Sequence, residues 1–173
     1  LSATATPVSR SQVGSSVTVI TEEEIQRRGA RTLNEILRTV PALDITPRGG
    51  PGQPTAIFTR GTNSSQTKVL LDGIPLNDPS SPSRAFDPSN FLLDNVQRIE
   101  VIRGPQSTLY GSDAIGGAIN IVTRRGNGPA QIRTTHEGGS FGTYTQSTTL
   151  SGGSERFWYS ISVQLSLFQN VPY

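Results

Sequence analysis

Few side chains in this sequence could support hydrolytic chemistry. Ser107, Asp113 and the single histidine, His136, are the residue types of a nucleophilic triad. No nucleophile motif surrounds the serine, and His136 lies among Thr and Glu residues in an alternating pattern typical of a strand. The carboxylates at 22–24 belong to an expected first helical turn, where they complement the helix dipole. We therefore expect a protein that is not an enzyme, and a hydrolytic alternative would have to depend on His136.

Metal and nucleic-acid chemistry are also disfavoured. The chain has no cysteine, and one histidine cannot form a paired-histidine metal site. The 15 basic and 13 acidic residues give a net charge of +2 without any Lys/Arg block, so no strong field attracts nucleic acid. We expect no metal, no cofactor and no nucleic-acid partner.

Two glycine-containing segments, residues 103–105 and 111–117, could by composition hold a phosphate. Their spacing differs from that of a P-loop or dinucleotide-binding loop, and no Lys-Ser or Lys-Thr pair follows them. Glycine also permits left-handed backbone and close chain approach, which is sufficient reason for its presence. An Asp-Gly pair between two apolar runs is typical of a hairpin turn. We expect structural turns at Asp72, Gly73, Gly104, Gly111, Gly116 and Gly117.

The composition indicates a turn-rich folded chain. Its 18 Gly and 12 Pro exceed the share of a typical globular protein. Residues 1–16 have almost no apolar periodicity, and we expect them to form a flexible leader. Because the sequence begins with Leu1 and without a signal-peptide core, we expect a processed or excised piece.

Capping residues and apolar periodicity predict a small mixed unit that ends near residue 125. Thr21 and Thr32 are each followed three residues later by glutamate, which predicts two short helices, the second running to about residue 39. A further short helix is predicted with Asp87 as its cap and Pro88 at its first position. Strands are predicted at residues 17–20, 43–46, 55–60, 68–71, 74–76, 98–103 and 118–123. The fold class is therefore α/β (α+β), with a small mixed four-stranded sheet and short helices.

The pattern changes to alternation near the end of the chain. Between residues 157 and 168 the odd positions are apolar, and most even positions are Ser or Gln. This run is longer than a soluble strand of about five or six residues and fits a tilted transmembrane strand of about 9–11. Residues 130–137 and 143–151 are weaker partner strands, too few for a closed membrane barrel, which needs about eight or more. A long half-buried strand of a soluble sandwich is the alternative.

Several blocks of sequence occur in the order found in one family. They are PALDI (41–45), RGT (60–62), VLLDGIPLN (69–77), VQRIEVIRGP (96–105) and LYGSDAIGGAINI (109–121). On these blocks, residues 17–125 resemble the plug domain of TonB-dependent outer-membrane receptors. The resemblance implies a leader with a remnant of the TonB box at 1–16, a plug domain at 17–126, and the first strands of a truncated barrel at 127–173.

The resemblance implies a transporter of the Gram-negative outer membrane. In this family a barrel of about 22 strands surrounds the plug, substrate binds from outside on plug and barrel loops, and TonB pulls from the inner membrane. The implied partners are TonB, outer-membrane lipid and a substrate. Residues 49–53, 57–63 and 110–117 are most similar to the cobalamin transporter, so cobalamin is the first expectation and a ferric siderophore the alternative. Outside the family, a soluble binding or adhesion module that uses exposed strand edges is a further alternative.

The resemblance also implies roles for particular residues. Substrate contacts are expected from the loops at 47–54 and 77–90, through Arg48, Gln53, Asn77, Asp78, Arg84 and Phe86. Contact with the barrel wall is expected for Arg60, Arg98, Glu100 and Arg103. Of these, Arg60 and Arg103 would meet acidic residues of the wall, and Arg98 and Glu100, on one face of the same strand, would pair with neighbours. Contact with TonB, by addition of a strand, is expected for Ser2, Ala3 and Thr4.

Overall fold

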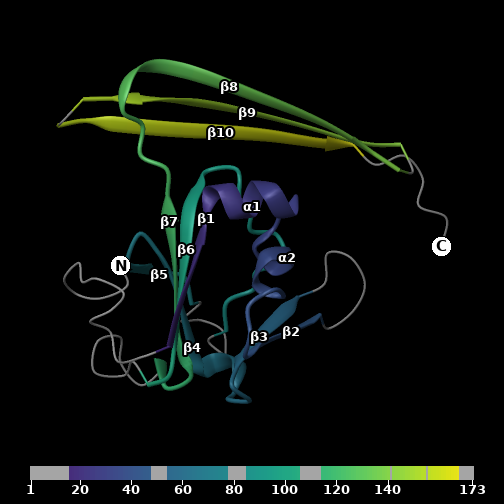
Figure 1. Ribbon diagram of the computed structural model, residues 1–173, viewed down its shortest axis with the longest axis vertical. Helices are drawn as coiled ribbons and strands as arrows, with labels where there is room; N and C mark the ends of the chain where they lie inside the picture. Colours follow the sequence, from purple (N-terminus) through teal and green to yellow (C-terminus); the bar gives the residue numbers. More distant parts are fainter. Residues whose placement is uncertain are drawn as a thin grey trace. The chain divides into compact units, whose positions relative to one another are not determined.

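The computed structural model describes residues 16–47, 54–77, 85–105, 114–140, 142–154 and 156–167. The chain divides into two compact units, Leu1–Thr123 and Arg124–Tyr173. Figure 1 shows the helices and strands of each unit. The expected leader lies, apart from Ser16, outside the described residues.

The centre of the first unit is a mixed five-stranded sheet (Figure 1). In spatial order its strands are β1 (Ser16–Thr21), β6 (Val96–Arg103), β7 (Gly117–Thr123), β4 (Thr67–Leu71) and β5 (Ile74–Pro75). β4 is parallel to β7, and the other neighbouring pairs are antiparallel. The predicted mixed sheet is confirmed, but it has five strands rather than four. The predicted strand at residues 74–76 is present as β5, because a turn at Asp72 and Gly73, with φ of 50° and 86°, folds two residues back onto β4.

The two ends of this sheet contain different parts of the chain. At one end Ser16 pairs with Arg103, and Arg103 pairs in turn with Gly117. We call this the entry end, because the chain enters β1 at Ser16. At the opposite end β7 finishes at Thr123 and the chain passes to the second unit. We call this the exit end.

Two short helices follow β1, and each begins at the predicted threonine. The Thr21 hydroxyl accepts a hydrogen bond from the Glu24 N–H at 3.4 Å and caps α1 (Glu22–Arg28). Thr32 and Glu35 form a complete capping box at the start of α2 (Leu33–Leu37). α2 ends two residues before the predicted position, because the N–H groups of the next turn bond to carbonyls three residues back rather than four.

A two-stranded sheet of β2 (Leu43–Pro47) and β3 (Thr55–Thr59) follows the helices, and a short 3-10 helix, η2 (Ser64–Gln66), leads into β4. The helices and this hairpin lie on one face of the five-stranded sheet (Figure 1). Burial of their apolar side chains against that face forms the main core and is the chief stabilising contribution. The buried members include Ile25, Leu33, Ile36, Leu37, Ile57, Val69, Ile99, Val101, Ile119 and Ile121.

The helix predicted after Asp87 is not formed. Asp87 instead accepts the N–H of Ser89 at 3.0 Å, and the Phe91 N–H bonds to the Pro88 carbonyl, which makes a turn. The chain then becomes extended, because residues 91–93 hydrogen-bond to the backbone of residues 31–33. This long-range pairing overrides the local helix signal.

The second unit is an antiparallel sheet of three long strands (Figure 1). They are β8 (Gly128–Gly139), β9 (Thr143–Gly153) and β10 (Trp158–Leu167), with β9 in the middle. Their lengths of 12, 11 and 10 residues suit transmembrane strands. The predicted additional antiparallel strands are confirmed. In the part of the chain that the structure describes, the helices are all too short to cross a bilayer.

Candidate functional site

The two candidate substrate loops are joined near their ends by one side chain. The first loop ends at Thr55, where β3 begins, and Asp87 lies in the second loop, beyond Phe86. The Asp87 Oδ1 atom accepts a hydrogen bond from the Thr55 N–H at 3.0 Å, across 32 residues of sequence. The same oxygen accepts the N–H of Ser89. Asp87 therefore connects the C-terminal end of the first loop to the C-terminal part of the second loop.

Two opposing effects act on the pKa of Asp87. Partial burial raises the pKa, because desolvation disfavours the carboxylate, but the backbone hydrogen bonds from Thr55 and Ser89 favour it. The hydrogen bonds outweigh burial, so the pKa lies below its usual value. The sequence around Asp87 predicted only a helix cap. No local pattern could have revealed its partner at Thr55.

Two of the expected substrate-contacting residues are described, and both hold the second loop to the folded unit. The Asn77 Oδ1 atom accepts the Val69 N–H at 2.9 Å, and its Nδ2 atom donates to the Thr67 carbonyl at 3.3 Å. Phe86 packs against the main core, and its ring meets that of Phe91 edge to face at 6.1 Å. The other expected substrate contacts lie outside the described residues: Arg48, Gln53, Asp78 and Arg84.

A tight turn follows β3 near the entry end of the sheet. Arg60 and Gly61 have φ of 52° and 74°, and the Thr62 N–H donates to the Thr59 carbonyl at 3.0 Å. This is the geometry of a type I′ turn, which is uncommon for a residue as large as arginine. The Arg60 guanidinium lies beside Gly104, where an added Cβ atom would be 3.8 Å from Nη1. The barrel contact expected for Arg60 stays a prediction.

Close backbone packing explains two of the predicted structural glycines. A Cβ atom at Gly116 would lie 2.4 Å from the Thr62 hydroxyl oxygen, and one at Gly117 would lie 2.3 Å from the Ile102 carbonyl oxygen. The Gly116 carbonyl also accepts the Gly104 N–H at 3.1 Å. A side chain would therefore displace the Thr62 side chain at Gly116 and the backbone of β6 at Gly117. Gly111 lies outside the described residues, as do Ser2, Ala3 and Thr4.

Arg103, the last residue of β6, makes three contacts within the first unit. Its Nη1 atom donates to the Pro41 carbonyl and its Nη2 atom to the Thr18 hydroxyl, both at 2.8 Å. Its Nε atom donates to the Ser16 carbonyl at 3.5 Å. The guanidinium thus links β6 to β1 and to the connection that follows α2. A further contact with the barrel stays a prediction.

Arg98 and Glu100 pair with each other on β6. The Glu100 carboxylate is fully buried and accepts hydrogen bonds from Arg98 Nε at 2.9 Å and from Asn120 Nδ2 at 3.4 Å. The Asn120 Oδ1 atom accepts the Gly73 N–H at 3.2 Å, which extends the network to the β4–β5 turn. Removing one partner would leave a buried charge uncompensated. Contact of this pair with the barrel wall also stays a prediction.

The second unit has one polar and one apolar face. Thr145, Ser147 and Thr149 of β9 are buried, at 5%, 9% and 4% exposure, and the β10 residues paired with them are Ser166, Gln164 and Ser162. The large apolar side chains of the opposite face are exposed, namely Ile132, Leu150, Ile161, Val163, Leu165 and Leu167. A soluble sheet has the reverse arrangement, whereas a strand in a membrane barrel turns its apolar side chains outward.

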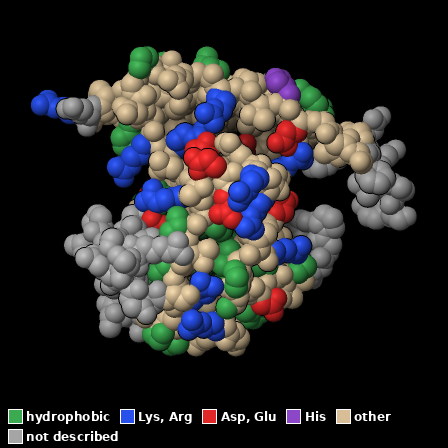
Figure 2. Space-filling view, viewed as in Figure 1, with side chains coloured by type: hydrophobic (Ala, Val, Ile, Leu, Met, Phe, Trp, Pro, Cys, Tyr) green, Lys and Arg blue, Asp and Glu red, His purple; other side chains and the backbone are tan. Residues whose placement is uncertain are grey.

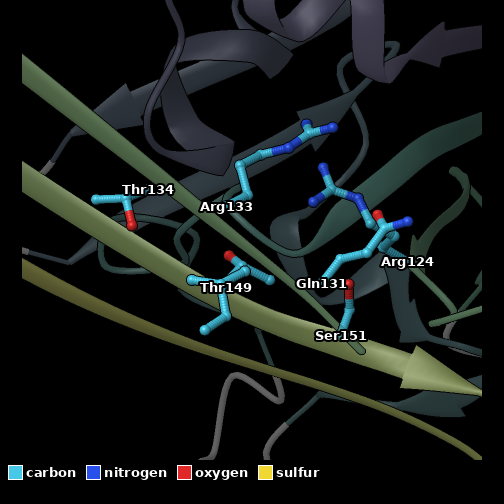
Figure 3. A pocket seen from close by; sticks show the side chains of 7 residues that line it. Arg124, Gln131, Arg133, Thr134, Thr149 and Ser151 are labelled. Atoms are coloured by element: carbon cyan, nitrogen blue, oxygen red, sulfur yellow. The ribbon is translucent and has the colours of Figure 1, made fainter. Parts of the chain in front are cut away.

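A hollow of about 390 Å³ lies over the polar face of β8 and β9. Figure 3 shows Arg133 and Gln131 extending from β8, with Thr149 and Ser151 of β9 beneath them and Arg124 beside them. Guanidinium, amide and hydroxyl groups make this surface suitable for polar neighbours. On the face of the molecule in Figure 2, basic and acidic side chains are interspersed, in keeping with the small net charge.

The fold is that of a plug: a small mixed sheet with short helices, followed by antiparallel strands that begin a membrane barrel. The family described as TonB-dependent Receptor Plug Domain matches residues 9–118. The chain belongs to this family. Its members are receptors rather than enzymes, and they are outer-membrane proteins of Gram-negative bacteria.

Solved receptor structures resemble the chain over most of its length. The ferric yersiniabactin uptake receptor FyuA from Yersinia pestis is 28% identical over 87% of the chain, with a TM-score of 0.68. The ferric enterobactin receptor PfeA from Pseudomonas aeruginosa is 27% identical over 90%, with a TM-score of 0.63. The ferripyoverdine receptor of Pseudomonas aeruginosa, at 18% identity over 95% and a TM-score of 0.76, shares the fold. The chain spans 24%, 25% and 22% of these three receptors.

The comparisons do not support the expected preference for cobalamin. The receptors described above are named for ferric siderophores, which sequence analysis placed second. The short blocks 49–53, 57–63 and 110–117 suggested cobalamin, but similarity over so few residues does not determine a substrate.

Proposed function

We propose that the chain is the plug of an outer-membrane transporter for a ferric siderophore, which it binds and whose TonB-dependent passage into the periplasm it controls. The observation that carries the proposal is the similarity to two ferric-siderophore receptors at 28% and 27% identity over most of the chain. The transport cycle belongs to the whole receptor, of which this chain provides the plug and the first strands.

The joined candidate loops support a shared substrate surface. Because Asp87 bonds to Thr55, the two loops return to the folded unit at neighbouring positions. A ligand that contacts both loops would then bind a surface whose two loop ends are fixed relative to each other. We propose that Arg48 and Arg84, one in each loop, provide positive charge for this contact. Ferric complexes of catecholate siderophores are anionic, and guanidinium groups are suited to anionic oxygen ligands.

The experiment measures equilibrium binding to the full-length receptor in detergent. The ligands are a ferric tris-catecholate, a neutral ferric hydroxamate and cyanocobalamin, followed by uptake of radiolabelled iron with and without TonB. We expect one ferric siderophore to bind tightly and to enter cells only when TonB is present. Tight binding of cyanocobalamin without binding of either ferric complex would overturn the substrate assignment.

A matched set of variants tests the two arginines. Arg48→Gln combined with Arg84→Gln is expected to weaken binding of an anionic ferric complex by about tenfold or more, because two charge-assisted contacts are lost. Arg27→Gln is the control, because Arg27 is an exposed helical residue with only a 4.0 Å ion pair to Glu24. Equal affinity of the double variant and the control would contradict the role of the two arginines.

A further inference from the structure

The strand that joins the leader to the plug is an edge strand. Among the strands that the structure describes, β1 pairs with β6 alone, and Ser16, its first residue, is paired with Arg103. A pull applied to the chain ahead of Ser16 loads β1 at its first residue. An edge strand loaded at its first residue can separate from the sheet one hydrogen bond at a time. The contacts at Ser16 therefore determine when separation begins.

The side chain of Arg103 adds a second attachment to this first pair. Its Nη2 atom donates to the Thr18 hydroxyl at 2.8 Å, and its Nε atom approaches the Ser16 carbonyl at 3.5 Å. Its Nη1 atom donates to the Pro41 carbonyl at 2.8 Å, on a segment separate from β1 and β6. One guanidinium therefore holds the start of β1 against two other parts of the unit. Guanidinium is suited to this task, because its donors are fixed in one plane.

Apolar burial at this end of β1 is modest. Val17 is buried beside Ile102 in a small cluster separate from the main core, and Val19 packs against it only in part. Ile20, near the other end of the strand, belongs to the main core. The first half of β1 therefore depends more on polar contacts than the second half does.

We propose that Arg103 is a latch that holds the first half of β1 in the sheet and so sets the ease with which this strand is released when TonB pulls. This inference deepens the proposed function and depends on TonB coupling, but not on the identity of the substrate. Arg103 is a positioning residue in this role, because it acts on β1 rather than on substrate. Release breaks its hydrogen bonds and leaves β6, β7 and β4 paired.

Hydrogen exchange of the full-length receptor tests the latch directly. We expect Arg103→Gln to accelerate amide exchange in residues 16–19 by about tenfold or more, because hydrogen bonds from a charged group are lost. Exchange in β7 should stay unchanged. Thr18→Val, which suits a strand but removes one acceptor, should produce a smaller acceleration. The control is Arg27→Gln on the exposed surface of α1, which should leave β1 at the wild-type rate.

The double variant determines whether Arg103 and Thr18 act together. We expect the double variant to exchange residues 16–19 at nearly the same rate as Arg103→Gln alone, because the hydrogen bond between Arg103 and Thr18 is already lost in the single variant. Wild-type exchange of residues 16–19 in Arg103→Gln, or equal effects of Thr18→Val in both backgrounds, would overturn the proposal. Neither readout needs substrate, so a wrong siderophore assignment would not affect this test.

Discussion

The carboxylate of Asp72 accepts two hydrogen bonds from Thr123. The Thr123 N–H lies 3.0 Å from Oδ1, and the Thr123 hydroxyl lies 2.6 Å from Oδ2. The Asp72 N–H also donates to the Ile121 carbonyl at 2.9 Å. Since Thr123 is the last residue of the first unit, the β4–β5 turn secures the strand from which the chain leaves the plug.

Loss of the Asp72 carboxylate should loosen this junction. Asp72→Gly suits the positive φ of 50° and removes both hydrogen bonds, so we expect a cost of about 1.5–3 kcal/mol. Thr123→Val removes only the hydroxyl contact and should cost less. Urea unfolding of the full-length receptor gives the free energies, and amide exchange at Thr123 locates the change. An Asp72→Gly variant as stable as wild type would show that the contact contributes nothing.

Asp87 should make the plug more sensitive to acid. Its pKa in the folded protein lies below its usual value, so the unfolded chain takes up a proton first as the pH falls. The ionised Asp87 carboxylate contributes its full stabilisation at pH values above the usual aspartate pKa. This contribution is lost as the pH falls through the pKa that Asp87 has in the folded protein. We expect the difference in unfolding free energy between wild type and Asp87→Asn to shrink over that window. A difference that is constant across the acidic range would contradict this assignment.

Gly117 should not tolerate a side chain. A Cβ atom there would lie 2.3 Å from a backbone carbonyl, and φ is 150°. We expect Gly117→Ala to cost about 3 kcal/mol or more, from strain and from displaced backbone. Gly138→Ala is the control, because an added Cβ atom there meets nothing within 4 Å, and it should change stability by less than about 0.5 kcal/mol. Comparable effects of the two variants in urea unfolding would refute the packing argument.

Neighbouring residues of β10 should respond differently to charge. Val163 is 67% exposed on the apolar face, whereas Gln164 lies on the polar face. We expect Val163→Lys to cost about 2–4 kcal/mol in the membrane, because its ammonium group would face lipid. Gln164→Lys should cost much less. The measurement is the fraction of full-length receptor that is assembled in the outer membrane. Equal losses in the two variants would contradict the assignment of the Val163 face to lipid and the Gln164 face to the barrel interior.

Local chemistry made much of the fold predictable. The spacing of Thr32 and Glu35 predicted a capping box that the structure forms, because both partners lie within one helical turn. The pair Asp72–Gly73 predicted a hairpin, since its two positive φ values suit that turn. The alternation over residues 157–168 predicted a long strand, which the structure forms as β10. In each case the predictive signal lies within one short stretch of sequence.

Interactions between distant residues were not predictable in this way. The helix expected after Asp87 failed because residues 91–93 pair with residues 31–33. The barrel contact that the resemblance implies for Arg103 stays a prediction, and nothing in the sequence indicated two of its acceptors, Pro41 and Thr18, which lie 62 and 85 residues away. Neither relationship leaves a periodic or spacing signal in the sequence, because both depend on how the whole unit folds.

The chain joins the plug at one end of the sheet and leaves it at the other, through strands that are not neighbours. β1 is separated from β7 by β6, and β7 is held on both sides. Detaching β1 would therefore open one margin of the plug while its tether at Thr123 stayed intact. Reversal would then require only that β1 pair with β6 again, because β6, β7 and β4 keep one another as partners.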